Sequence, residues 1–102
     1  MFKLKPNPTF FAKVDIPVPG SDPASLDIEF RHMRREDAAE FARGLGERDP
    51  MESLRQVVVG WKGVAEEFSD GALAELHANY AGAADRILAA YFDELRGARR
   101  KN

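Results

Sequence analysis

The sequence predicts an α+β domain in which an N-terminal β-hairpin is followed by about four α-helices, so that the domain is mainly helical. Apolar and polar residues alternate with a period of two within residues 9–33, as in a pair of half-buried strands. After Arg35 the spacing of apolar residues changes to three and four, which is typical of amphipathic helices. The chain has 102 residues, and this length fits a single domain over 1–102.

The first third of the chain is expected to form an arm and the hairpin. Residues 1–8 carry lysines and prolines, which favours a loosely held arm. The hairpin covers residues 9–33, with a loop rich in turn residues at 19–23. Each strand should present one apolar face, made of Phe10, Ala12, Val14, Ile16 and Val18 in the first strand and Leu26, Ile28, Phe30 and His32 in the second. A lone hairpin is marginal in water, so this face must pack on the rest of the domain.

The helical part is predicted over residues 34–102, and its first two helices have clear signals. The first has an apolar face formed by Ala38, Phe41, Ala42 and Leu45. The second should begin at Asp49 as N-cap, with Pro50 at N1 and Glu52 at N3. Its apolar face would run through Met51, Leu54, Val57 and Val58 to Trp61. Because β-branched valines are poor helix formers, tertiary packing would have to stabilise the end of this helix.

Two further helices are expected after the glycines that flank Trp61. Ser69 is a good N-cap for the third helix. The last helix should run from about Ala81 to Arg99, with a basic C-terminal end that suits the helix dipole. Trp61 would lie between the second and third helices and hold them together. The predicted core residues are Trp61, Phe41, Leu54, Val58, Phe68, Leu88 and Phe92.

The residues offer little for catalysis or for binding a cofactor or metal. The chain has no cysteine, and its two histidines, His32 and His77, lack the spacing of a metal site. The acidic clusters adjoin helix starts, where the dipole favours carboxylates. No segment has the length and apolar character of a membrane span or a signal peptide. We therefore expect a soluble intracellular protein that is not an enzyme and needs no cofactor.

Surface candidates for partner binding come from the aromatic residues and the basic C-terminus. Phe10 and Phe11 lie on opposite faces of their strand, so one of them can remain exposed to a partner. The long last helix adds Tyr91, and the arginine-rich end adds Arg99 and Arg100. A net charge of −2, from 15 basic and 17 acidic residues, gives no general reason to expect nucleic-acid binding. A small DNA-binding or regulatory protein that uses this arginine-rich end remains the alternative.

An ordered set of motifs resembles the tail assembly chaperones of long-tailed bacteriophages and prophages. The set begins with Phe11–Gly20 and Leu26–His32, which are similar to that family's N-terminal strands. It continues with Val58–Val64, which contains Gly60 and Trp61, and with the pair Phe68-Ser69. It ends with Ala90–Leu95 and the terminal Arg99–Asn102. The resemblance covers nearly the whole chain, and its motifs are structural rather than catalytic.

The resemblance implies a non-enzymatic factor in tail morphogenesis that is absent from the finished virion. Such a protein binds the tape-measure protein and tail-tube subunits in the host bacterial cytoplasm until the tube polymerises. The family also implies homo-oligomers and, in many members, a frameshifted extended form. A groove or a strand edge can shield an apolar stripe on a long helical tape-measure protein by binding alone, with no catalytic step.

Overall fold

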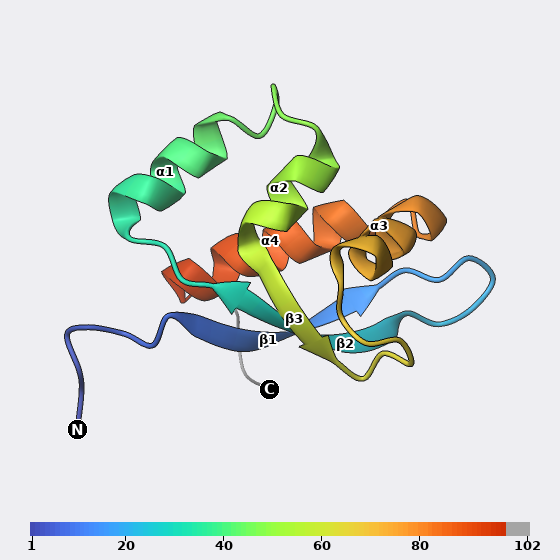
Figure 1. Cartoon of the computed structure of the whole chain (residues 1–102), viewed down its shortest axis with the longest axis horizontal. Coiled ribbons are helices and arrows are strands. Elements are labelled where there is room, and N and C mark those ends of the chain that lie inside the picture. Colours follow the sequence, from blue (N-terminus) through green and yellow to red (C-terminus); the bar gives the residue numbers. More distant parts are fainter. Residues whose placement is uncertain (98–102) are drawn as a thin grey trace.

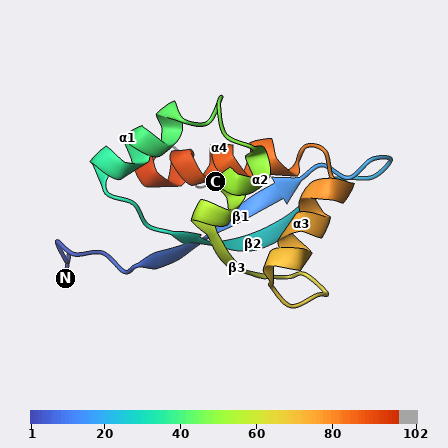
Figure 2. The same cartoon turned by 45° about the horizontal axis from the view of Figure 1, so that its top comes forward.

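The structure is a computed structural model that describes residues 1–97. A three-stranded antiparallel sheet forms one layer, and α1, α2 and α4 lie along one of its faces (Figures 1 and 2). In both views α3 lies at the end of the sheet where the β1–β2 loop projects. The elements in chain order are β1 (Thr9–Ile16), β2 (Ala24–Arg31), α1 (Arg35–Arg43), α2 (Pro50–Val57), β3 (Val58–Lys62), α3 (Asp70–Asn79) and α4 (Ala83–Arg96). The predicted α+β class, with an N-terminal hairpin and four helices, is confirmed.

The sheet has the strand order β1-β2-β3, so the hairpin supplies its centre and one edge. In the hairpin, Phe10 pairs with Phe30 and Val14 with Leu26, which puts the alternating apolar residues on one face. That face is covered by the helices. The opposite face carries polar side chains and ion pairs, such as Lys13 with Asp27 at 3.4 Å.

The prediction that the second helix continues towards Trp61 is wrong, because the chain forms the strand β3 from Val58 onwards. Valine side chains lose rotamer freedom in a helix but fit a pleated sheet, and the free edge of β2 offers them hydrogen-bond partners. Glu29 pairs with Gly60 and Phe30 with Val58, so Val59 is the extra residue of a bulge. The glycine at position 60 thus belongs to a strand and not to a turn.

The helix ends agree in part with the predicted signals. Ser69 caps α3, since its hydroxyl accepts a hydrogen bond from the backbone N–H of Ala72 at 3.0 Å. Asp49 precedes Pro50 at the start of α2, but its side chain makes no capping hydrogen bond. The last helix ends at Arg96 and not near Arg99, because Gly97 adopts a left-handed conformation with φ of 70°.

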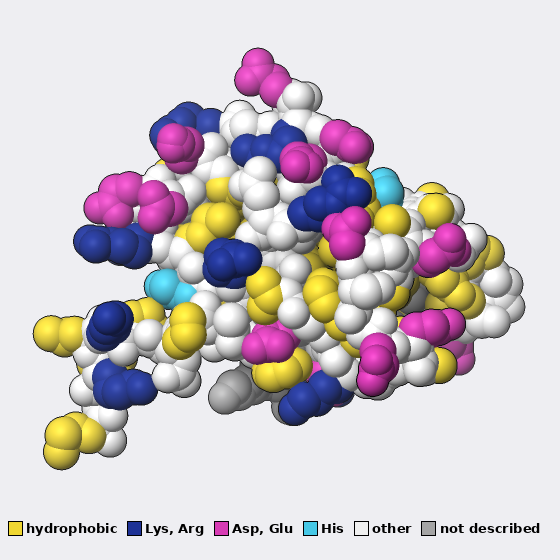
Figure 3. Space-filling view, viewed as in Figure 1, with side chains coloured by type: hydrophobic (Ala, Val, Ile, Leu, Met, Phe, Trp, Pro, Cys, Tyr) yellow, Lys and Arg dark blue, Asp and Glu magenta, His cyan; other side chains and the backbone are white. Residues whose placement is uncertain are grey.

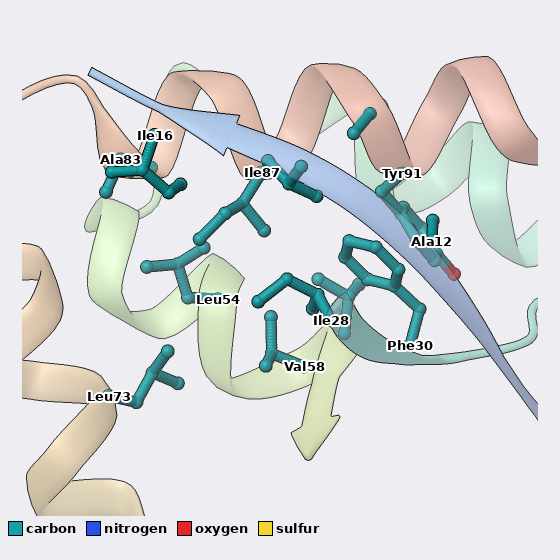
Figure 4. Packing of buried hydrophobic residues seen from close by; sticks show 14 of the residues in the cluster. Ala12, Ile16, Ile28, Phe30, Leu54, Val58, Leu73, Ala83, Ile87 and Tyr91 are labelled. Carbon is teal, nitrogen blue, oxygen red and sulfur yellow. The ribbon is translucent and has the colours of Figure 1, made fainter. Parts of the chain in front are cut away.

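The core lies between the sheet and helices α2 and α4. Figure 4 shows Ile28 and Phe30 from the sheet together with Leu54 from α2 and Ile87 and Tyr91 from α4. All five side chains are fully buried. Ring centroids of Phe30 and Tyr91 are 5.1 Å apart, a distance at which aromatic pairs stabilise one another. Helix α4 therefore packs on the hairpin and closes the core.

Candidate partner-binding site

The predicted core residues occupy two zones. Phe41, Leu54 and Val58 lie in the buried core. The other four are partly buried and pack against it, namely Trp61, Phe68, Leu88 and Phe92. Trp61 lies on β3 opposite Ile28 and therefore on the helix-covered face of the sheet. Its ring meets Phe68 edge-on at 5.1 Å, and its Nε1–H donates to the carbonyl of Glu66 at 3.0 Å.

The placement of Tyr91 among the partner-binding candidates is corrected by the structure. Its side chain is fully buried, because α4 turns this residue onto the sheet between Phe30 and Phe41. The hydroxyl donates a hydrogen bond to the carbonyl oxygen of Arg31 at 2.8 Å. Burial raises the pKa of Tyr91 to about 12, with a smaller opposing effect from the charge of Arg31. Tyr91 thus joins the end of β2 to α4 and presents nothing to a partner.

The two adjacent phenylalanines of β1 have different environments. Phe10 is partly buried, with its ring 5.7 Å from Phe30 and 6.1 Å from Tyr91. Phe11 lies on the uncovered face and is 46% exposed, with the Lys62 ammonium 4.3 Å from its ring centroid. Phe11 is thus the partner-binding candidate that lies on the surface. The candidates Arg99 and Arg100 lie outside the described residues.

A groove with a basic rim lies between α1 and α4, and we call it the α1–α4 groove. Its volume is about 570 Å³. The residues that line it are His32, Met33, Arg34, Arg35, Ala38, Ala39, Ala42, Phe92, Leu95 and Arg96. Small alanines come from α1 and larger apolar side chains from α4, while three arginines stand at the rim. Sequence reasoning missed this groove, although the Ala38/Ala42 spacing on α1 is one signal that could have suggested it.

A second groove lies between α3 and the hairpin-loop end of the sheet, and we call it the α3 groove. It has a volume of about 380 Å³. Its apolar lining residues are Ile16, Val18, Ala24, Leu26, Trp61, Val64, Ala72, Leu76 and Tyr80. The charged residues that line it are Glu66 and Glu75, and both are acidic. The two grooves are therefore both apolar inside and opposite in charge at their rims.

The arm, residues 1–8, carries the most exposed apolar side chains of residues 1–97. Phe2 is 88% exposed and Leu4 is 94% exposed. The backbone N–H of His32 donates to the carbonyl of Pro8 at 2.9 Å, which ties the root of the arm to the chain after β2. Figure 3 shows the arm projecting from the body, with yellow apolar and dark blue basic side chains together. Exposed apolar groups of this kind mark interaction segments.

Within residues 1–97, the titratable and metal-ligating side chains do not form a cluster typical of an active site. That part of the chain has no group of three or more His, Asp or Glu residues placed to hold a metal ion. The Nδ1 atom of His77 is buried without a hydrogen-bond partner among the described residues. Asp70 raises the pKa of Arg55 through a 2.7 Å ion pair that ties α3 to α2. In the described part of the chain, the helices are too short or too polar to cross a membrane.

The fold and its surface define a small α+β protein with apolar grooves and a projecting arm, features that suit contacts with other proteins. The chain matches the family model described as phage tail assembly chaperone over residues 1–102, and it belongs to that family. Comparisons with curated proteins and with solved structures found no match.

Family membership confirms the resemblance seen in the sequence. It indicates a role in assembly rather than catalysis, with phage tail proteins as partners in the infected host cell.

Proposed function

We propose that this chaperone binds the tape-measure protein, and that an apolar helix of that protein lies in the α1–α4 groove. The observation that carries the proposal is the apolar groove with three arginines at its rim. In this mode of recognition, an amphipathic helix places its apolar face into a groove between two helices. Binding would shield the tape-measure stripe until tail-tube subunits replace the chaperone.

The α1–α4 groove suits a helix because the side chains on its two walls differ in size. Ala38 and Ala42 lie one turn apart on α1, and their short side chains permit a close approach of a partner backbone. Phe92 and Leu95 on α4 supply apolar area on the other wall. Large side chains of a partner would therefore fill the space that the alanines leave.

The rim indicates the charge of the partner segment. Arg34 and Arg96 are exposed, and each is paired with a nearby acid, Glu36 at 3.9 Å and Asp93 at 3.4 Å. Exposed pairs of this kind contribute little and can be exchanged for a better partner. A helix whose apolar stripe is flanked by Asp or Glu would complement these arginines.

The further parts of the proposal follow from the family and from the weak contacts expected of a small domain. The chaperone would also bind tail-tube subunits, act in the host bacterial cytoplasm and be absent from the finished virion. Self-association would multiply its contacts along a long partner through avidity. An extended form made by frameshifting would add a second module at the C-terminus. The alternative, a DNA-binding or regulatory protein, depends on Arg99 and Arg100 outside the described residues, and family membership favours the assembly role.

The experiment is co-expression with the tape-measure protein of the same phage, followed by capture on a C-terminal tag. Ala42→Glu places a charged side chain in the groove at an exposed position of α1 and should weaken capture by at least about tenfold. Ala89→Glu makes the same change at an exposed position of α4 outside both grooves, so it should capture the partner as the wild type does. Circular dichroism melts check that both variants fold.

Two outcomes would overturn the proposal. If the wild-type chain does not capture the tape-measure protein, the function is wrong. If Ala42→Glu and Ala89→Glu capture it equally well, the partner binds elsewhere and the α1–α4 groove is not its site.

A further inference from the structure

The arm and the α3 groove lie at opposite ends of the molecule. The N-terminus is at one end of the long axis, and α3 lies near the other in two views 45° apart (Figures 1 and 2). The arm is rooted at Pro8 by the hydrogen bond from His32, so it begins beside the end of β2 that is far from the groove. In the structure the arm of a chain therefore points away from that chain's own groove.

The arm and the groove complement each other in apolar character. Phe2 and Leu4 alternate with Lys3 and Lys5, so an extended arm presents two apolar side chains on one side. Both are almost fully exposed. The α3 groove has an apolar lining that includes Trp61 and Leu76, and its volume of about 380 Å³ is within the range of small binding pockets. Prolines at positions 6 and 8 restrict the arm and so reduce the entropy lost when it is bound.

The charges complement each other as well. The arm carries Lys3 and Lys5, and the α3 groove carries Glu66 and Glu75. Figure 3 shows the same contrast, with dark blue side chains on the arm and magenta side chains beside yellow ones towards the α3 end. The α1–α4 groove has arginines at its rim and would repel a basic arm.

We propose that the arm of one chain binds in the α3 groove of a second copy, with Phe2 and Leu4 in the groove and the two lysines near its glutamates. The two surfaces differ, so the contact is heterologous, and its repetition builds rings or open spirals. This inference rests on the self-association proposed above. It leaves the α1–α4 groove free for the tape-measure protein, so the two proposals can fail separately.

The test uses the full chain with any tag at the C-terminus, so that the arm is free. Sedimentation velocity up to about 100 μM measures association, and Trp61, the single tryptophan, reports occupancy of the groove by its fluorescence. The variant Phe2→Ser with Leu4→Ser should raise the dissociation constant at least about tenfold. Ala89→Ser is the control, because it changes an exposed position of α4 outside the arm and both grooves, and it should associate as the wild type does.

A charge exchange tests the pairing of the two surfaces. Lys3→Glu with Lys5→Glu reverses the arm, and Glu66→Lys with Glu75→Lys reverses the groove; each protein alone should associate more weakly than the wild type. A mixture of the two should associate more strongly than either alone, because the reversed arm then meets the reversed groove.

The Trp61 emission of the wild type should change with concentration, and that of the Phe2→Ser, Leu4→Ser variant should not. The inference is overturned if the wild type stays monomeric or if the arm variant associates as the wild type does. It is also overturned if the mixture of the two charge-reversed proteins associates no more strongly than either protein alone. A tape-measure capture that survives in the arm variant leaves the proposed function intact.

Discussion

Replacement of Tyr91 by phenylalanine should remove a pH-dependent part of the stability. At pH 7 the variant loses the hydrogen bond from the buried Tyr91 side chain to the Arg31 carbonyl, which is 2.8 Å long and partly buried. Loss of such a bond costs about 1–2 kcal/mol of the free energy of unfolding. The ring itself stays, so the packing against Phe30 is kept.

The difference between wild type and Tyr91→Phe should shrink at alkaline pH. Burial raises the pKa of Tyr91 from its ordinary value of 10.0 to about 12 in the folded chain. The unfolded chain therefore releases the phenol proton first, and unfolding becomes more favourable as the pH rises. The contribution of the neutral phenol is fully present below pH 10.0 and is lost as the pH rises towards about 12. At about pH 11 the loss amounts to roughly 1.4 kcal/mol, so the wild type should have little or no advantage left.

The assay is urea unfolding of both proteins at several values between about pH 7 and pH 11, followed by far-UV circular dichroism. Circular dichroism is preferred because ionised tyrosine alters the emission of Trp61. Tyr80→Phe is the control at pH 7, since it removes a hydroxyl from a partly exposed ring and should change stability by less than about 0.5 kcal/mol. A difference between wild type and Tyr91→Phe that stays constant up to about pH 11 would refute the reasoning, because it would show that the phenol is not desolvated.

Two further substitutions test the third strand. Gly60→Ala places a Cβ 2.6 Å from Glu29 Oε1, at the end of a side chain held by Thr9, so this side chain must shift, and the change should cost up to about 1 kcal/mol in urea unfolding. Adding Glu29→Ala should recover part of this loss; simple additivity of the two changes would contradict the proposed clash. Trp61→Ala should cost about 2–3 kcal/mol in thermal melts, less than a fully buried tryptophan because its ring is only partly covered. A loss below about 1 kcal/mol would show that the contact with Phe68 contributes little.

The local sequence alone determined those elements for which hydrophobic periodicity, turn residues and capping residues point to the same structure. Alternation over 9–33 was enough for the hairpin, since its register places Phe10, Ala12, Val14 and Ile16 of β1 on one face. The Ser69 cap was also readable, because a hydroxyl three residues before a free backbone N–H acts locally. The ordered motifs around Trp61 identified the family, which needs no knowledge of the fold.

Tertiary structure decided the points at which local signals conflict or are silent. Val58 could continue a helix or start a strand, and the open edge of β2 selected the strand. Tyr91 fits an exposed or a buried face of a long helix, and only the packing of α4 on the hairpin buried it. Sequence reasoning missed the grooves because each is made by elements far apart in the chain. Local energetics thus set where most strands and helices form, while the free edges and faces that remain after folding set where this chaperone can meet a partner.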